Sequence, residues 1–208
     1  MMRIESLSAQ PDRAGRYRTV FSDGSTLRLY RQTVDDFGLY TGMEMDDETF
    51  SRLQVAAGQM SAKMRAVRIV AASSVSQKDL EQRLIHKGED PKQAKEAVQW
   101  LESLDLIDDR KTAEQIIARC IAKGYGLARA KQALYEKRIP KEYWQEALAD
   151  YPDQLEAIVA FLGSRLTGES DDRQVKKAID ALLRRGHSYA QIRKGLQKLS
   201  LNEDFSED

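Results

Sequence analysis

One short helical pattern occurs three times along the chain, and this repetition limits the possible folds more than any other feature. A small residue is followed by an apolar residue four positions later and a leucine eight positions later, in Ser76–Leu84, Gly126–Leu134 and Ser188–Leu196. Apolar residues at this spacing lie on one face of a helix. The three starts are 50 and 62 residues apart, as in stacked helical units. We therefore predict a mainly α-helical protein of three tandem, degenerate three-helix repeats in a curved, solenoid-like body.

Helix start and stop signals place these repeats in the sequence. Ser76 with Asp79 has the spacing of a capping box, and Asp90-Pro91 is typical of a helix start. A basic residue followed by glycine is typical of a helix end and occurs at Gly88, Gly124 and Gly186. We expect the first repeat at residues 61–108, the second with an extra helical segment at 109–168, and a truncated third repeat with an acidic tail at 169–208.

Residues 1–60 have a different pattern and predict a small module that contains a β-hairpin. Arg16–Phe21 and Thr26–Tyr30 partly alternate polar with apolar residues, as half-buried strands do. Asp23-Gly24 lies between them and favours a tight turn in which both residues have positive φ. The acidic residues 44–50 predict one short helix, and a separate helix is expected to begin near Ser61.

Composition excludes several classes of protein. No stretch approaches the roughly 18 apolar residues that span a bilayer, and the N-terminus lacks the apolar core of a signal peptide, so no membrane partner is expected. Cys120 is the only cysteine, which excludes an internal disulfide framework and predicts a cytoplasmic location. The 33 basic residues balance 33 acidic residues, which argues against coating nucleic acid through bulk charge.

No group of residues predicts catalysis, a cofactor or a metal site. Cys120 falls in an apolar helical stripe and is interpreted as a core thiol. His86 and His187 stand at helix ends, where capping or solvent exposure is expected. Asp108-Asp109 precedes a helix, which favours capping over acid–base catalysis. Gly124–Gly126 lacks the Lys-Ser/Thr pair of a phosphate loop and is interpreted as a turn. We therefore expect a protein that is not an enzyme.

Uneven charge along the chain indicates an interaction surface. Gln32–Ser51 contains six acidic residues and no Lys or Arg, whereas Arg173–Lys198 contains eight basic residues and one acidic residue. Basic residues gather on helices whose apolar stripes are otherwise occupied. We take nine of them as candidate contacts with a partner: Arg65, Arg68, Lys123, Arg129, Lys131, Arg184, Arg185, Arg193 and Lys194. The two-helix pattern leaves an alternative open, a helical module that binds nucleic acid. Zero net charge argues against sequence-specific reading but leaves weak contact with DNA phosphates possible.

Several motifs, taken in order, resemble the RecX regulatory-protein family. Leu104–Asp109 resembles the family's aliphatic junction ending in Asp-Asp, and Ala113-Glu114 follows it as in the family. Lys123–Gly126 resembles the family's Arg/Lys-Gly-Tyr/Phe-Gly turn, with Ala130 and Leu134 downstream.

The third repeat and the N-terminal module extend the resemblance. Arg185–Tyr189 resembles the third-repeat turn of the family, and the hairpin module is similar to one carried by its longer members. The similarity covers about residues 64–199. Two structural positions depart from it: Asp105 stands where the family often has glycine, and Thr112 where it often has an aromatic residue.

The resemblance implies a protein that binds RecA recombinase, notably the RecA filament on single-stranded DNA. Members of the family are curved, all-helical repeat proteins that lie along the filament groove and bridge neighbouring protomers. They restrain ATP hydrolysis, strand exchange and co-protease activity, which implies a regulator of DNA repair, homologous recombination and the SOS response. We expect a monomer without a cofactor whose basic helix faces contact the filament. The alternative is a nucleic-acid-binding module that acts independently of RecA.

Overall fold

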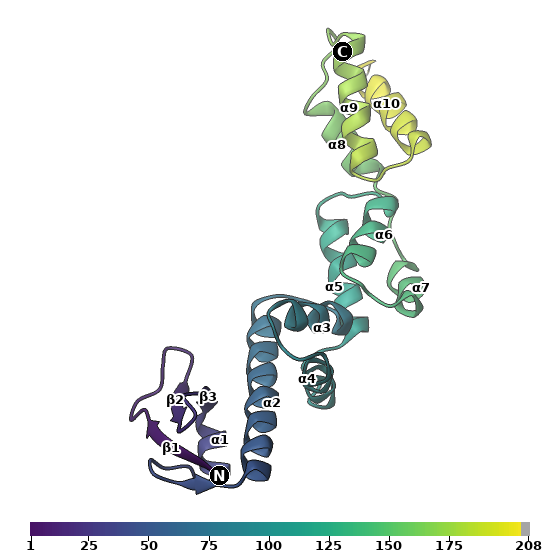
Figure 1. Cartoon of the computed structure of the whole chain (residues 1–208). Helices are drawn as coiled ribbons and strands as arrows, with labels where there is room; N and C mark the ends of the chain where they lie inside the picture. The colour runs from purple at the N-terminus through teal and green to yellow at the C-terminus, as the bar shows by residue number, and fades with distance from the viewer. Residues whose placement is uncertain (205–208) are drawn as a thin grey trace. The chain divides into compact units, whose positions relative to one another are not determined.

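The computed structural model describes residues 1–204, with side chains through residue 199 (Figure 1). The chain forms two compact units, the first ending at Ile107 and the second beginning at Asp108. Helices dominate both units, and the first also carries a small antiparallel sheet. The prediction of a mainly α-helical protein with a hairpin-containing N-terminal module is therefore confirmed. Within the described residues, no helix is both long and apolar enough to cross a bilayer.

The N-terminal module contains a four-stranded sheet. Its strands are antiparallel neighbours in the order β3-β2-β1-β4: β1 (Met2–Leu7), β2 (Arg16–Phe21), β3 (Thr26–Tyr30) and β4 (Glu44–Met45). The predicted hairpin is β2–β3, but its turn differs from the expected one. Gly24 has φ +79° whereas Asp23 does not have positive φ, and Gly24 N donates to Phe21 O at 2.9 Å. This is a three-residue hairpin loop that ends in a left-handed glycine.

One long helix connects the sheet to the first helical repeat. After α1 (Arg31–Asp36), α2 runs from Asp47 to Ala72. Asp46 caps the start of this helix, because its side chain accepts a hydrogen bond from Thr49 N at 2.7 Å. The two helices expected at residues 44–50 and from residue 61 are thus one continuous helix. Gly58 lies inside it and leaves room for a neighbouring side chain, because a Cβ there would lie 2.3 Å from Gln93 Oε1.

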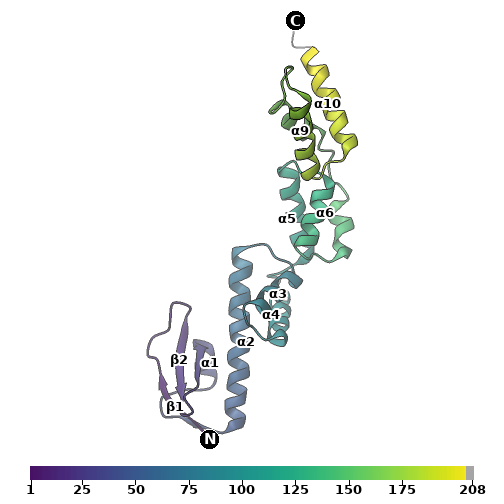
Figure 2. The same cartoon turned by 45° about the horizontal axis from the view of Figure 1, so that its top comes forward.

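The two halves of α2 serve two different cores. Leu53 and Ala57 pack under the sheet with Phe21, whereas Ala62 and Ala66 pack in a helical core. That second core is completed by α3 (Gln77–His86) and α4 (Pro91–Ser103), which lie beside the second half of α2 (Figure 2). Both helices start as predicted, because the side chains of Ser76 and Asp90 accept hydrogen bonds from backbone N–H groups of the first turn.

Helix ends use left-handed residues, as the basic-Gly signal predicts. Gly88, Gly124 and Gly186 have φ values of +89°, +62° and +85° and follow α3, α5 and α9. Asp105 follows α4 in the same way, with φ +55°. The next residue, Leu106, donates a hydrogen bond from its backbone N–H to Leu101 O at 3.0 Å. Left-handed backbone favours glycine, which explains why glycine would suit the Asp105 position. Aspartate tolerates it better than most other residues.

The second unit begins with a three-helix core. It comprises α5 (Asp109–Ala122), α6 (Leu127–Glu136), the short 3-10 turn η1 (Lys141–Tyr143) and α7 (Trp144–Leu148). Asp108 caps α5, because its side chain accepts a hydrogen bond from Lys111 N at 3.1 Å. The capping role expected for this residue is confirmed. Cys120 lies in this core with 5% exposure, so its interpretation as a core thiol is also confirmed. Burial raises the pKa of the Cys120 thiol.

The remaining helices form a further core in the second unit. It is built by α8 (Leu155–Gly163), α9 (Asp172–Arg184) and α10 (Tyr189–Asp204), through Ile158, Leu162, Leu182 and Ile192. The extra segment assigned to the second repeat therefore packs with the third repeat, which has three helices rather than a truncated set. Gly195 on α10 permits this packing, since a Cβ there would lie 2.5 Å from Ile158 Cγ2. The limits predicted at residues 60, 108 and 168 stay predictions, and residues 205–208 of the expected acidic tail lie outside the described residues.

Candidate functional site

Two turns of the second unit bind each other directly. The first turn, Gly124–Gly126, follows α5, and the second, Arg185–His187, follows α9. Gly126 N donates to Arg185 O at 2.9 Å, and Ala128 N donates to Gly186 O at 3.3 Å. We call this arrangement the turn pair. Because both bonds join main-chain atoms, the turn pair fixes the backbone of Arg185 against the start of α6.

The two glycines at the centre of the turn pair are required by close approach. A Cβ on Gly126 would lie 2.1 Å from Gly186 O and 2.5 Å from His187 N. A Cβ on Gly186 would lie 2.2 Å from Arg129 N. Gly126 has φ −76°, which any residue can adopt, so its only requirement is space. Gly186 meets two requirements, since its φ is also left-handed.

His187 makes a third contact between the two turns. Its side chain is 4% exposed, and Nε2 lies 3.0 Å from Gly124 O. The expectation of a capping or exposed histidine is therefore wrong for His187, because the turn pair covers it. Burial lowers its pKa most, the charge of Arg185 lowers it further, and the hydrogen bond to Gly124 O opposes both. A neutral ring with Nε2–H as donor satisfies the contact with Gly124 O, and the buried Nδ1 atom then has no hydrogen-bond partner within the described residues.

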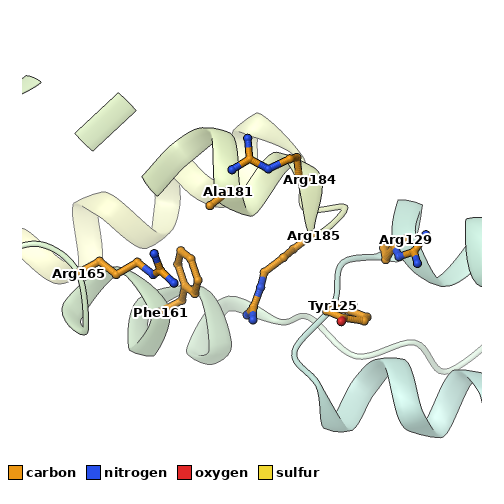
Figure 3. A pocket seen from close by; sticks show the side chains of 7 residues that line it. All are labelled: Tyr125, Arg129, Phe161, Arg165, Ala181, Arg184 and Arg185. Carbon is orange, nitrogen blue, oxygen red and sulfur yellow. The ribbon is translucent and has the colours of Figure 1, made fainter. Parts of the chain in front are cut away.

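A pocket rich in arginine opens beside the turn pair. Its volume is about 290 Å³, and its lining residues come from α6, α8 and the turn after it, α9, and the two turns of the turn pair (Figure 3): Tyr125, Arg129, Phe161, Arg165, Ala181, Arg184 and Arg185. We call it the arginine pocket. None of these residues is acidic, so the pocket concentrates positive charge in a protein of zero net charge.

Aromatic rings hold two of the guanidinium groups in place. Arg165 lies over the Phe161 ring at 4.4 Å and Arg185 at 4.8 Å, and Figure 3 shows them on either side of that ring. Arg185 is also 5.9 Å from the Tyr125 ring. Each such contact contributes roughly 0.5–1 kcal/mol at an exposed site. The backbone of Tyr125 is itself held in place, since its carbonyl oxygen accepts a hydrogen bond from the Tyr151 hydroxyl at 2.6 Å.

Charge in the arginine pocket is only partly compensated. Arg129 pairs with Glu136 at 2.9 Å, and this pairing lowers the pKa of Glu136. Within the described part of the chain, the guanidinium groups of Arg165, Arg184 and Arg185 have no ion pair or hydrogen bond. Their N–H donors therefore face the pocket or solvent and are available to an anionic ligand.

The structure separates the nine predicted contact residues into groups. Arg129, Arg184 and Arg185 come together in the arginine pocket. A second group is exposed on the same unit but does not line the pocket: Lys123, Lys131, Arg193 and Lys194. The pocket residues that sequence reasoning missed are Tyr125, Phe161, Arg165 and Ala181. The pair Phe161 and Arg165, four residues apart beside a glycine, was a usable signal for a ring–guanidinium contact.

Arg65 and Arg68 of the first unit are occupied by internal contacts. Arg65 Nε pairs at 2.7 Å with Glu89, a carboxylate that is almost buried, and Arg65 also donates to Lys87 O. Arg68 donates to Ala14 O and to the Tyr30 hydroxyl, both at 3.0 Å, and so ties α2 to the sheet module. Both side chains have a clear role in holding the first unit together.

No cluster of three His, Cys, Asp or Glu residues with the geometry of a metal site occurs in the residues that the structure describes. The residues of the arginine pocket are of the kind that recognise anions. Fixed guanidinium planes and neighbouring aromatic faces bind phosphate or carboxylate groups and planar rings.

Comparison with known proteins connects this geometry to a family. The family model "RecX, second three-helix domain" matches residues 108–148, which contain α5, α6 and α7. The regulatory protein RecX of Chlorobaculum tepidum is 31% identical over 147 residues, covering 69% of this chain and 91% of that protein. The chain belongs to the RecX family.

Other RecX proteins and two solved structures extend the similarity. The regulatory protein RecX of Streptococcus gordonii is 24% identical over 192 residues, covering 90% of this chain and 74% of that protein. The crystal structure of RecX from Lactobacillus salivarius has a TM-score of 0.59 at 26% identity and covers 70% of this chain and 99% of its own. A crystal structure of regulatory protein RecX, at 20% identity and a TM-score of 0.63, shares the fold over 93% of this chain and 100% of its own.

Proposed function

We propose that this RecX family member regulates RecA recombinase. It binds RecA and the filament that RecA forms on single-stranded DNA, and it restrains ATP hydrolysis, strand exchange and co-protease activity. Through these effects it regulates DNA repair, homologous recombination and the SOS response in the cytoplasm. Membership of a family of regulatory proteins is the observation that carries the proposal. The protein acts as a monomer, by surface contact rather than by catalysis, and without a cofactor.

The second unit carries the proposed contact surface. Seven of the nine candidate residues lie there: Lys123, Arg129, Lys131, Arg184, Arg185, Arg193 and Lys194. Arg184, Arg193 and Lys194 are exposed and have no ion pair within the described residues, so a partner of opposite charge meets little competition. Arg65 and Arg68 are used inside the first unit and are the weaker candidates for contact.

Titration into a RecA ATPase reaction on single-stranded DNA tests the proposal. The wild-type protein should lower the rate of ATP hydrolysis, and the variant Arg184→Glu/Arg185→Glu/Arg193→Glu should lose most of that effect, because three reversed charges repel the surface that the arginines contact. The matched control is Arg173→Glu/Lys176→Glu/Lys177→Glu, which changes charge equally at exposed positions of the same unit. If both variants lost inhibition equally, the effect would depend on the total charge of the protein and not on the proposed surface. Full inhibition by the first variant, folded as judged by circular dichroism, contradicts the proposed surface.

The alternative function, nucleic-acid binding without RecA, makes a different prediction. In that case the protein binds DNA tightly and with steep salt dependence, and it leaves RecA unchanged when DNA is saturating. The observation that favours this alternative is the arginine pocket, whose positive charge suits DNA phosphates. Inhibition that persists when DNA is in excess over the regulator would exclude it.

A further inference from the structure

Four side chains of the second unit form a layered series next to the turn pair. Arg165, Phe161, Arg185 and Tyr125 follow one another, with guanidinium-to-ring distances of 4.4, 4.8 and 5.9 Å between successive members. Figure 3 shows Arg185 reaching into the space between the Phe161 and Tyr125 rings. Charged and aromatic layers alternate in this series. Contact with the rings leaves the N–H donors of Arg165 and Arg185 unused, since neither side chain has a hydrogen bond within the described residues.

We infer that the arginine pocket is a binding site for single-stranded nucleic acid, in which Arg165, Arg184 and Arg185 bind backbone phosphates and an unstacked base lies against the Arg185–Tyr125 end of the series. This inference deepens the proposed function, because single-stranded DNA is part of the filament on which that function rests. The site nevertheless binds the strand without RecA, so the two proposals fail separately.

Charge and geometry explain the choice of a phosphate as the anchored group. The pocket has no acidic lining residue, and the three guanidinium groups named have no competing partner among the described residues. Arginine binds a phosphate through two parallel N–H donors. A volume of about 290 Å³ is roughly that of ten water molecules at about 30 Å³ each, which accommodates a phosphate with part of its nucleotide.

The half-buried aromatic rings and the guanidinium planes beside the pocket explain the choice of a single strand. Proteins bind unpaired bases by stacking them on aromatic rings or on arginine planes. In a duplex those base faces are covered by neighbouring base pairs, so a duplex engages the pocket through phosphates alone. An acidic peptide brings the negative charge but no planar group for the Tyr125 side of the series. The alternation of rings and arginines thus favours nucleic acid over a carboxylate-rich segment.

Fluorescence anisotropy with a short labelled oligothymidylate and the full chain, in the absence of RecA, tests the inference. Arg165→Ala/Arg184→Ala/Arg185→Ala should weaken binding by roughly tenfold or more for each arginine that contacts the phosphate. The slope of log K against log salt should fall by about 0.7 for each lost phosphate contact. Arg173→Ala is the matched control, since its side chain is exposed and lies on α9 eleven residues, or about 16 Å, before Arg184.

A conservative variant separates stacking from charge. Arg165→Lys/Arg185→Lys keeps both positive charges but loses the planar groups, so affinity should fall while the salt slope stays near the wild-type value. The inference is overturned if the triple alanine variant binds as wild type does, if Arg173→Ala weakens binding equally, or if a poly-glutamate peptide binds more tightly than the oligonucleotide. A DNA duplex of the same length should bind more weakly than the single strand. Equal affinity for the two would contradict the stacking of a base in the pocket. Circular dichroism verifies that each variant is folded.

Discussion

Replacing Gly126 by alanine should destabilise the second unit by a predictable amount. The added Cβ would stand 2.1 Å from Gly186 O and 2.3 Å from Gly186 C, so the two turns must move apart. Separation breaks the Gly126 N–Arg185 O and Ala128 N–Gly186 O bonds. Each such bond contributes about 1 kcal/mol, and the His187 contact is strained with them. We therefore expect a loss of about 2–4 kcal/mol in the free energy of unfolding.

Gly163→Ala is the matched control for this prediction. It makes the same chemical change in the same unit, but the nearest atom to its Cβ is Leu199 Cδ1 at 3.5 Å, an ordinary contact distance. Alanine is favoured over glycine in helices by up to about 1 kcal/mol, so this variant should be neutral or slightly more stable. Backbone strain does not enter for Gly126, whose φ of −76° suits alanine.

Urea denaturation followed by circular dichroism gives the stability of both variants, and amide hydrogen exchange gives the location of the change. In Gly126→Ala, the amides of residues 126 and 128 should exchange faster, because they lose their acceptors across the turn pair. Wild-type stability in Gly126→Ala would refute the reasoning, and so would an equal loss in Gly163→Ala.

Three further predictions follow from single contacts. Burial lowers the pKa of His187 from its usual value of about 6.5. The unfolded chain therefore takes up the proton first, and stability should begin to fall as the pH decreases below about 6.5. In urea denaturation, the fall that sets in just below pH 6.5 should appear in the wild type and be absent from His187→Gln. Tyr151→Phe should cost about 1 kcal/mol, since the hydroxyl donates to Tyr125 O. In the wild type, ultraviolet titration should find this phenol still protonated beyond pH 11, because burial raises its pKa to about 12. Arg65→Ala should lower stability by about 1–3 kcal/mol, because the nearly buried Glu89 carboxylate loses its ion pair and keeps the hydrogen bond from Ser61 Oγ. RecA inhibition should stay intact at temperatures where the variant is folded, and loss of inhibition there would return Arg65 to the contact surface.

Local signals in the sequence were sufficient for the helix ends. The caps at Ser76, Asp90 and Asp108, and the left-handed glycines 88, 124 and 186, depend on a few neighbouring residues and were predicted at the right positions. The hairpin at Asp23-Gly24 was located for the same reason. Its turn type was missed because the same dipeptide serves both two-residue and three-residue loops.

Features that depend on distant residues were missed. The glycine inside α2, Gly58, makes room for Gln93, which lies 35 residues later in the sequence. Residues near position 58 give no sign of this contact. The third core needs α8, which is separated from α9 by a loop and was therefore assigned to the preceding repeat. His187 was expected to cap a helix or to be exposed, because it stands at the end of a helix. The turn after α5 covers it, and that turn lies far away in the sequence.

The same backbone contacts that join the two cores of the second unit also position the arginine pocket. Arg185 O accepts Gly126 N, while the Arg185 side chain lies between Phe161 and Tyr125. Because main-chain bonds fix Arg185 on one side and Gly126 follows directly after Tyr125 on the other, the distance between this guanidinium and the Tyr125 ring is set by the turn pair. Gly126→Ala should therefore reduce oligonucleotide affinity at temperatures where its helices remain folded, although it removes no atom from the pocket. Unchanged affinity in that variant would mean that the pocket residues bind the strand as independent, mobile side chains.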